Sequence, residues 1–400
     1  MKIEINKPEF LKSWQMAERA GSLKSAISSL GGVLVSAASD KIYLSATDLR
    51  TSVKCEAKGI TSLSGDGLET GAVFPIKILG ELFKKASADV ISVSIEGEKG
   101  VFASGRNKTR FVTWRAEDFP NLPQSDSASH FCDISAAELS RLLSEGSIAG
   151  SAKDDFPKYL GACLFNITSG TLRVVSTDAR RLSISRCPVQ ADSDAEFLLP
   201  VTPLHELSRL LSDVKDTEDN AEPIKVFYDD SLVWFKVGGD NGYIELSVRR
   251  VEASFPNYEK ILNPNSASSV VVRRDSLISA LERIDIVVRS HTRIVVMKLS
   301  PGGKMVLSGR APDTGTAFEE IDAIIDGDPV KAGFNVGFIQ EGLKSIISDD
   351  VRLSLNGEAG QMNMRRSDTD DFLYMLMPVR LNDADISDDE TETDEDTPAS

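Results

Sequence analysis

The chain has 400 residues, of which 41% are hydrophobic and 26% charged, a length typical of about two to four domains with substantial cores. This composition excludes a collagen-like chain and a wholly disordered one, and no apolar run approaches the ~20 residues of a membrane helix. The four cysteines form no CxxC pair and no disulfide framework. We therefore expect a protein of the reducing cytoplasm without a secretory signal.

The charge is concentrated at the carboxyl end. The formal net charge is −16, and residues 383–400 carry nine acidic residues and no basic one, so −7 remains for residues 1–382. We expect an acidic, disordered tail over 383–400, serving solubility or acting as a regulatory arm that competes with partners. A body at −7 does not bind nucleic acid by bulk attraction, which requires clustered cations.

Two families of segments recur along the chain at spacings of about 125–138 residues. Both predict helix starts, and short alternating runs between them predict antiparallel strands. The first family is Lys7–Lys12, Ala136–Arg141 and Arg274–Ser279; the second is Phe74–Lys84, Leu199–Arg209 and Phe334–Lys344; the strands include Thr171–Ser176, Leu232–Val237 and Val351–Leu355. We therefore expect an α+β chain of three tandem domains, 1–125, 126–262 and 263–382, each with two helices and antiparallel sheets, followed by the tail 383–400.

Motifs for catalysis are missing from the sequence. There is no GxxxxGK[ST] phosphate loop and no GxGxxG turn, and the three histidines are isolated, so we assign no metal and no cofactor. Asp48 and Asp178 could form an acid/base couple in a nucleotide-processing enzyme. Because they occupy equivalent places in two repeats, a turn-capping role is favoured, and we expect no enzymatic activity.

Two other patterns leave alternatives open. Cations gather on the helices that start each repeat, either as ordinary solvated faces or as the basic inner wall of a closed ring that contacts phosphates without reading bases. The run Tyr374–Leu381 is either a carboxyl-terminal core strand or, with Met375 and Met377, an adaptable surface for several partners.

The sequence resembles a known family at several ordered motifs. They are Tyr159–Phe165, Leu172–Leu182, Phe255–Leu262, Gly333–Val336 and Met377–Leu381, and they resemble the bacterial sliding clamps, the beta subunits of DNA polymerase III. The resemblance spans nearly all of residues 1–382. It implies a head-to-tail homodimer that closes as a ring around duplex DNA with helices lining the hole, opened by a clamp loader and used by polymerases as a tether that raises processivity.

The resemblance also implies site residues. A peptide-binding cleft would use Leu160, Thr177, Ala179, Arg180, Arg181, Leu182, Pro256, Lys260, Ile261, Asn335, Phe338, Met375, Leu376, Met377, Pro378, Val379 and Arg380. In this cleft Arg181 and Asn335 would fix a peptide's backbone or polar side chain. DNA contacts would fall on Lys24, Lys77, Lys153, Lys158 and Tyr159, with Tyr159 stacking on a base or packing on a sugar.

The chain departs from the family at three places. Ala179-Arg180 stands where relatives usually carry Gly-His, and Leu23–Ser28 replaces a proline-containing stretch. The tail that follows Leu381 would repel acidic peptides or occupy the cleft in cis.

A repeat protein of similar fold that serves only protein assembly is the alternative function. We expect a cytoplasmic, nucleoid-associated protein that binds no membrane.

Overall fold

The computed structural model describes residues 1–38, 41–65, 71–151, 156–213, 222–238, 243–262, 266–300 and 302–381. The expected tail 383–400 and Lys153 lie outside these described residues. The chain forms two compact units. One comprises Met1–Ser140, Ile167–Gly170 and Pro188–Val251, and the other comprises Arg141–Asn166, Thr171–Cys187 and Glu252–Ser400. The central repeat thus contributes to both units.

Each repeat contains the two predicted helix starts. The helices α1 (Lys7–Glu18), α3 (Ala136–Gly146) and α5 (Arg274–Val288) each follow a strand: β1 (Lys2–Asn6), β10 (Ser129–Ile134) and β18 (Ser268–Arg273). The second helices are α4 (Val201–Asp213), α6 (Val336–Ser345) and, in the first repeat, a π-helical turn η2 (Ile76–Gly80) that continues as α2 (Glu81–Lys85). Pro8 is tolerated in the first turn of α1 because no intrahelical partner is lost there.

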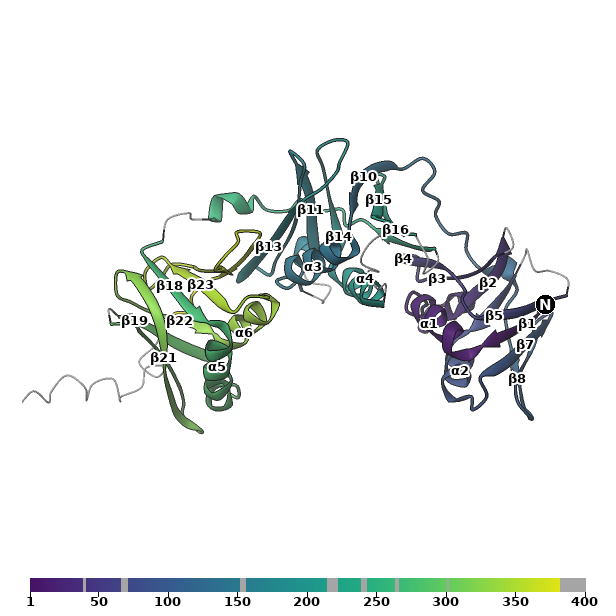
Figure 1. Ribbon diagram of the computed structural model, residues 1–400, viewed down its shortest axis with the longest axis horizontal. Helices are drawn as coiled ribbons and strands as arrows, with labels where there is room; N and C mark the ends of the chain where they lie inside the picture. Colours follow the sequence, from purple (N-terminus) through teal and green to yellow (C-terminus); the bar gives the residue numbers. More distant parts are fainter. Residues whose placement is uncertain are drawn as a thin grey trace, which may run out of the picture. The chain divides into compact units, whose positions relative to one another are not determined.

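The first unit contains two antiparallel sheets, with strand orders β5-β1-β7-β8-β9 and β10-β15-β16-β17-β4-β3-β2-β6. Helix α1 lies beside α2 (Figure 1) and packs on it through Phe10, Trp14 and Phe83, with ring centroids of Phe10 and Phe83 5.2 Å apart. The strand bounds are β2 (Gly32–Ala38), β3 (Lys41–Thr47), β4 (Thr51–Glu56), β5 (Ile60–Ser64), β6 (Ala72–Pro75), β7 (Val90–Glu96), β8 (Lys99–Ser104), β9 (Asn107–Val112), β14 (Ala195–Pro200), β15 (Ile224–Tyr228), β16 (Leu232–Val237) and β17 (Ile244–Arg249).

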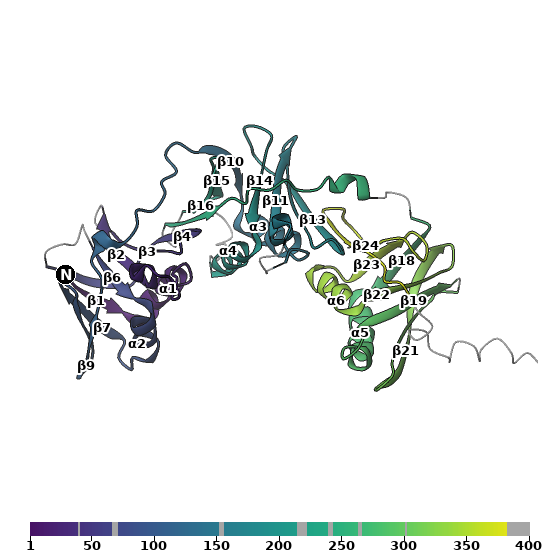
Figure 2. The ribbon, with the colours of Figure 1, turned by 180° about the vertical axis from the view of Figure 1, so that it is seen from behind.

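The second unit is built on a long sheet in which the strands follow the order β11-β12-β13-β25-β24-β23-β18-β21-β20-β19-β22. Helices α5 and α6 lie side by side against its carboxyl-terminal part (Figures 1 and 2). The bounds are β11 (Ala162–Thr168), β12 (Thr171–Thr177), β13 (Arg181–Pro188), β19 (Ile294–Ser300), β20 (Lys304–Ala311), β21 (Gly315–Gly327), β22 (Val330–Asn335), β23 (Asp350–Leu355), β24 (Met362–Arg366) and β25 (Phe372–Leu376).

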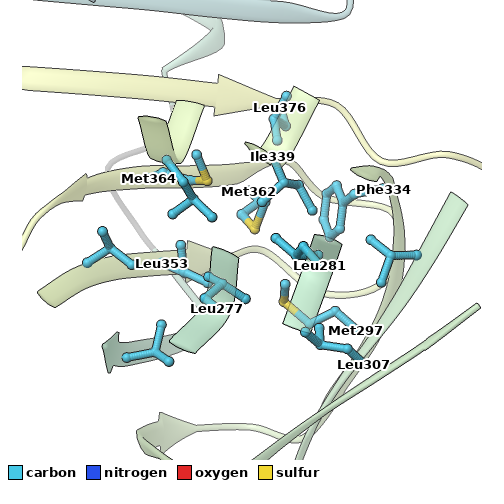
Figure 3. Close-up of a cluster of buried hydrophobic side chains, with 14 of the residues drawn as sticks. Leu277, Leu281, Met297, Leu307, Phe334, Ile339, Leu353, Met362, Met364 and Leu376 are labelled. Atoms are coloured by element: carbon cyan, nitrogen blue, oxygen red, sulfur yellow. The ribbon is translucent and has the colours of Figure 1, made fainter. Parts of the chain in front are cut away.

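The core of this unit joins both helices to the sheet. Leu277 and Leu281 of α5 and Ile339 of α6 point toward Phe334 and Met362 of the strands (Figure 3), and all five are fully buried. Burying side chains of this size contributes roughly 1.5–3 kcal/mol each. The predicted strands near residues 171, 232 and 351 are confirmed as β12, β16 and β23.

Candidate functional site

The site begins where a strand of the second repeat pairs with the last strand of the chain. In the second unit β13 lies antiparallel to β25, with Arg181 opposite Leu376 and Leu182 opposite Met375. Beyond the ladder, the Met377 amide donates to the Arg180 carbonyl at 2.9 Å. This pairing places the turn before β13 beside the residues after β25, as the predicted cleft requires.

The turn Thr177–Arg181 is built by its own side chains. Asp178 Oδ1 accepts from the amides of Arg180 and Arg181, both at 3.0 Å, and Thr177 Oγ1 donates to the Arg181 carbonyl at 2.7 Å. Ala179 has a φ of 69°, a left-handed conformation that costs roughly 1–2 kcal/mol for a residue with a Cβ. The side chains of Ala179 and Arg180 are exposed as a result.

The Arg181 guanidinium is already engaged within the protein. Its Nε donates to Asp178 at 2.9 Å, and its Nη1 donates to Tyr374 Oη at 3.0 Å and to Glu341 of α6. The guanidinium also lies 4.3 Å from the ring centroid of Phe338. Burial alone would lower the pKa of Arg181, but Tyr374 and Glu341 outweigh it and raise the pKa. Arg181 therefore braces the turn against α6.

The carboxyl-terminal run contributes both core and surface. Met375 and Leu376 are only 2% and 1% exposed, whereas Met377 is 47% exposed and Pro378 and Val379 are half-buried. Arg380 is exposed. The strand ends at Leu376, immediately before Met377-Pro378, and Val379 then forms a single bridge with Gly333. Met377, Pro378 and Val379 thus present the apolar surface, and Met375 and Leu376 support it from below.

Residues of the third repeat fix the start of α6 at the same place. Asn335 Oδ1 accepts from the Phe338 amide at 3.1 Å, so Asn335 is the amino-terminal cap of the helix. Phe338 is half-buried under the Arg181 guanidinium. The side-chain oxygen of Asn335 therefore caps the helix, whereas its side-chain amide nitrogen has no hydrogen-bond acceptor among the described residues.

Leu160 lies on the short 3₁₀ turn η4 (Lys158–Gly161), Lys260 and Ile261 lie on a second such turn, η5 (Tyr258–Ile261), and Pro256 precedes η5. Leu160 is half-buried, whereas Pro256, Lys260 and Ile261 are exposed, Ile261 by 50%. The Tyr159 ring packs edge-on against Phe255, with centroids 6.0 Å apart. Turn η4 also contacts β12, the strand that leads into the Thr177 turn. Thr177 and Leu182 are buried beneath the turn. We call the set formed by the exposed Ala179, Arg180 and Met377 and the half-buried Pro378 and Val379 the Met377 surface.

A buried ionic network lies at the other end of the β13–β25 pairing, where Ser185 is opposite Phe372, and no local pattern in the sequence indicates it. Glu145 of α3 contacts Arg366 of β24, and Arg366 also contacts Asp371. Ser185 of β13 donates to Glu145 at 2.6 Å. Burial raises the pKa of Glu145, against the lowering effects of Ser185, Arg366 and Arg141. The network ties the second repeat to the third across the β13–β25 pairing.

The predicted DNA-contact lysines are exposed cations. Lys24 follows α1, Lys77 lies on η2 and Lys158 lies on η4, and among the described residues none of the three has an ion-pair partner. Lys12 of α1, one of the helix cations noted in the sequence but not among the predicted DNA contacts, is likewise exposed and has no ion-pair partner among the described residues. Tyr159 is half-buried against Phe255, so much of its ring is occupied by packing.

Other helix cations serve the fold instead. Lys84 pairs with Glu18 at 3.1 Å, Arg209 with Glu206 at 2.8 Å, and Arg283 with Glu319. Exposed pairs of this kind are worth about 0–1 kcal/mol each. Among the described residues, some helix cations thus stabilise the fold through ion pairs, whereas Lys12, Lys24, Lys77 and Lys158 form no ion pair. The phosphate-contact alternative stays open for these four lysines.

The structure confirms the turn-capping role of the two aspartates. Asp48 Oδ1 accepts from the amides of Arg50 at 2.8 Å and Thr51 at 2.6 Å, as Asp178 does in the second repeat. Within the described part of the chain, no group of three or more His, Cys, Asp or Glu residues could hold a metal ion. Among those same residues no helix is long and apolar enough to cross a membrane.

Three family models match the chain in sequence. They are the amino-terminal, central and carboxyl-terminal domains of the DNA polymerase III beta subunit, over residues 1–123, 133–257 and 259–380. The beta sliding clamps of Pseudomonas aeruginosa and Vibrio cholerae are 28% and 25% identical, covering 95% of this chain and 100% of each relative.

Solved structures agree with the sequence comparison. The beta subunit from Thermotoga maritima matches with a TM-score of 0.84 at 25% identity, and the Pseudomonas aeruginosa clamp bound to griselimycin with 0.85 at 25% identity; each covers 95% of this chain and 100% of the other. These relatives are non-catalytic processivity subunits. With three repeats that each match a successive domain of the beta subunit, the chain belongs to the family of bacterial beta sliding clamps.

Proposed function

We propose that this chain encircles duplex DNA as a head-to-tail homodimeric ring and tethers DNA polymerases to it, without catalysis of its own. The observation that carries the proposal is the match of three successive repeats to the three domains of the beta subunit. We take the domains as 1–125, 126–262 and 263–382, with the acidic tail after them. The protein acts in the cytoplasm at the nucleoid, and a clamp loader opens and closes the ring on DNA.

Two strand edges support the head-to-tail dimer. In the first unit β9 ends the order of described strands, and Val112 on it is 69% exposed. In the second unit the first half of β21 pairs only with β20 among the described strands, and Phe318 there is 55% exposed. Exposed apolar edges are templates for strand pairing with another chain. We assign these two edges to the dimer interface.

Lys24, Lys77 and Lys158 are the proposed DNA contacts, and we add Lys12 because it is also exposed and has no ion-pair partner among the described residues. Weak phosphate contacts suffice, because enclosure replaces affinity and loose contacts permit sliding. Lys153 stays in the proposed set on the resemblance alone. The Met377 surface is the proposed docking place for polymerase peptides, where a high effective concentration of the enzyme raises processivity. Pro256, Lys260 and Ile261 are included in this proposed site on the resemblance alone.

The decisive test is topological. The protein is loaded onto nicked circular plasmid with a clamp loader, and the complex is isolated by gel filtration before and after linearisation. We expect retention on the circle and loss from the linear form. Retention on both forms, or on neither, would contradict encirclement and leave the assembly-only alternative.

Matched variants separate the DNA contacts from general charge. Neutralising Lys24, Lys77 and Lys158 to Gln should lower loading several-fold at physiological salt, because each lost phosphate contact removes counterion release. The control neutralises the ion-paired Lys85, Arg209 and Lys304, which are similarly exposed. Equal losses in both triples would contradict the assignment.

Met377→Glu should keep retention on circles while reducing stimulation of a DNA polymerase III catalytic subunit.

A further inference from the structure

The first unit contains a second copy of the corner that carries the Met377 surface. Thr47 Oγ1 donates to the Thr51 carbonyl at 2.9 Å, and the Leu49 amide donates to Thr47 Oγ1 at 2.9 Å, as in the Thr177 turn. The Arg249 amide donates to the Arg50 carbonyl at 2.8 Å, the counterpart of the bond from Met377 to Arg180. Arg50 and Arg249 thus stand where the second unit has Arg180 and Met377.

A pocket lies over this corner within the first unit. It encloses about 170 Å³, and its walls include Leu49, Pro120, Leu122 and Leu232 together with Arg50 and Arg249. Pro120 belongs to the segment Phe119-Pro120-Asn121, which repeats as Phe255-Pro256-Asn257 beside the proposed peptide cleft. A volume near 150 Å³ accepts a ring the size of benzene, so this pocket has room for one large aliphatic or aromatic side chain.

The two repeats differ in the residue that ends the turn, which is Thr51 in the first unit and Arg181 in the second. Thr51 occupies the place of Arg181, since each residue ends the turn and begins the strand that pairs across the sheet. The first unit therefore has no guanidinium bound across its corner in the manner of Arg181. Leu49 is 51% exposed at the mouth of the pocket.

The rim of the pocket is cationic. Arg50 and Arg249 are both exposed, and neither has an ion-pair partner within the described residues. Guanidinium groups bind carboxylates in a bidentate geometry that an ammonium group cannot copy. The pocket is lined by leucine and proline side chains together with Thr47, Ser52 and Asn121, and two arginines without ion-pair partners among the described residues stand at its rim. This combination suits a ligand with one apolar side chain between carboxylates.

We propose that this pocket is a second docking site, which takes a linear acidic peptide segment of another protein. One large apolar side chain of the segment enters between Leu49, Leu122 and Leu232, and carboxylates on either side bind Arg50 and Arg249. The exchange of Met377 for Arg249 gives the two corners of one chain different preferences, apolar at the Met377 surface and acidic here.

The test uses the full-length protein and fluorescein-labelled pentapeptides in an anisotropy titration. The probe is Glu-Asp-Leu-Asp-Glu; one control replaces its Leu with Ser, and a second replaces its four acids with Gln and Asn. We expect saturable binding of the probe and at least about fivefold weaker binding of both controls. No saturable binding of the probe would overturn the proposal.

Protein variants locate the binding. Arg50→Gln with Arg249→Gln should weaken the probe about tenfold, the equivalent of two exposed charge pairs, while Met377→Glu should leave it unchanged. Leu232→Gln provides a second variant without a charge change, and thermal unfolding checks that each variant folds. Loss of binding in Met377→Glu alone would place the peptide at the other corner. A large gain in affinity on deleting 383–400 would make the chain's own tail the occupant. Either result overturns the proposal.

Discussion

The turns at Thr47 and Thr177 are two copies of one backbone structure with different surroundings. Both use an aspartate Oδ1 for two amides and a threonine hydroxyl for the closing carbonyl. In the second unit Arg181 connects its turn to Glu341 and Tyr374, whereas in the first unit Thr51 leaves an open pocket. Local hydrogen bonds therefore specify the turn. The residue that ends the turn, Arg181 or Thr51, determines whether a side chain binds across it or a pocket remains beside it.

The largest expected effect comes from the buried network of the second unit, which lies at the end of the β13–β25 pairing away from the Thr177 turn. Arg366→Met leaves Glu145 buried without its main cation, and removing one partner of a buried pair costs about 3–5 kcal/mol. Urea denaturation should show this loss. The double variant with Glu145→Leu should recover much of it, since both charges are then absent.

The control is Arg365→Met, whose partner Asp370 lies 3.6 Å away and is 61% exposed. This change should cost less than about 1 kcal/mol. Equal costs for Arg365→Met and Arg366→Met would contradict the stabilising role that we assign to the buried network of the second unit.

A smaller effect should be shared by both corners. Leu49 and Ala179 have φ values of 72° and 69°, so Leu49→Gly and Ala179→Gly should each stabilise the chain, by up to about 1 kcal/mol, because glycine adopts this conformation without strain. Ala86→Gly is the control, since its φ of −61° suits any residue, and it should be neutral or destabilising. Thermal unfolding of the three variants measures the difference.

The smallest effect is the dependence of stability on pH, which we expect from Asp371 and Glu145 of the buried network in the second unit. Burial would raise the pKa of Asp371, but a Thr369 hydrogen bond and the charges of Arg366 and Arg141 outweigh it and hold the pKa below its ordinary 3.8. The stability that Asp371 contributes is therefore present above pH 3.8 and lost as the pH falls below it. Glu145 has the opposite sign: its raised pKa makes stability fall as the pH rises above its ordinary 4.5.

Thermal unfolding between pH 3 and pH 7 should separate the two groups. Asp371→Asn should flatten the acid side of the profile below about pH 4, and Glu145→Gln should flatten the decline above about pH 4.5. Identical profiles for both variants and the parent would show that neither carboxyl titrates differently in the fold.

Local patterns predicted the repeats, the helix starts and the aspartate turns, because each depends on neighbours within a few residues. They could not reveal the contact of Arg181 with Glu341 or that of Arg366 with Glu145, whose members lie 160 and 221 positions apart in the sequence. They also could not divide the run at Met375–Met377 into core and surface. Strand β25 is buried on both faces, so its apolar residues show no alternation.

The position of β25 between β13 and β24 has a consequence for chains that are cut short. A chain ending before Phe372 would lose the strand that fills this gap, and β13 and β24 would each expose unpaired amides and carbonyls. Incomplete molecules would then be prone to aggregation and exposed to proteases. Strand β25, the last strand among the described residues, thus protects the edges of both of its neighbours.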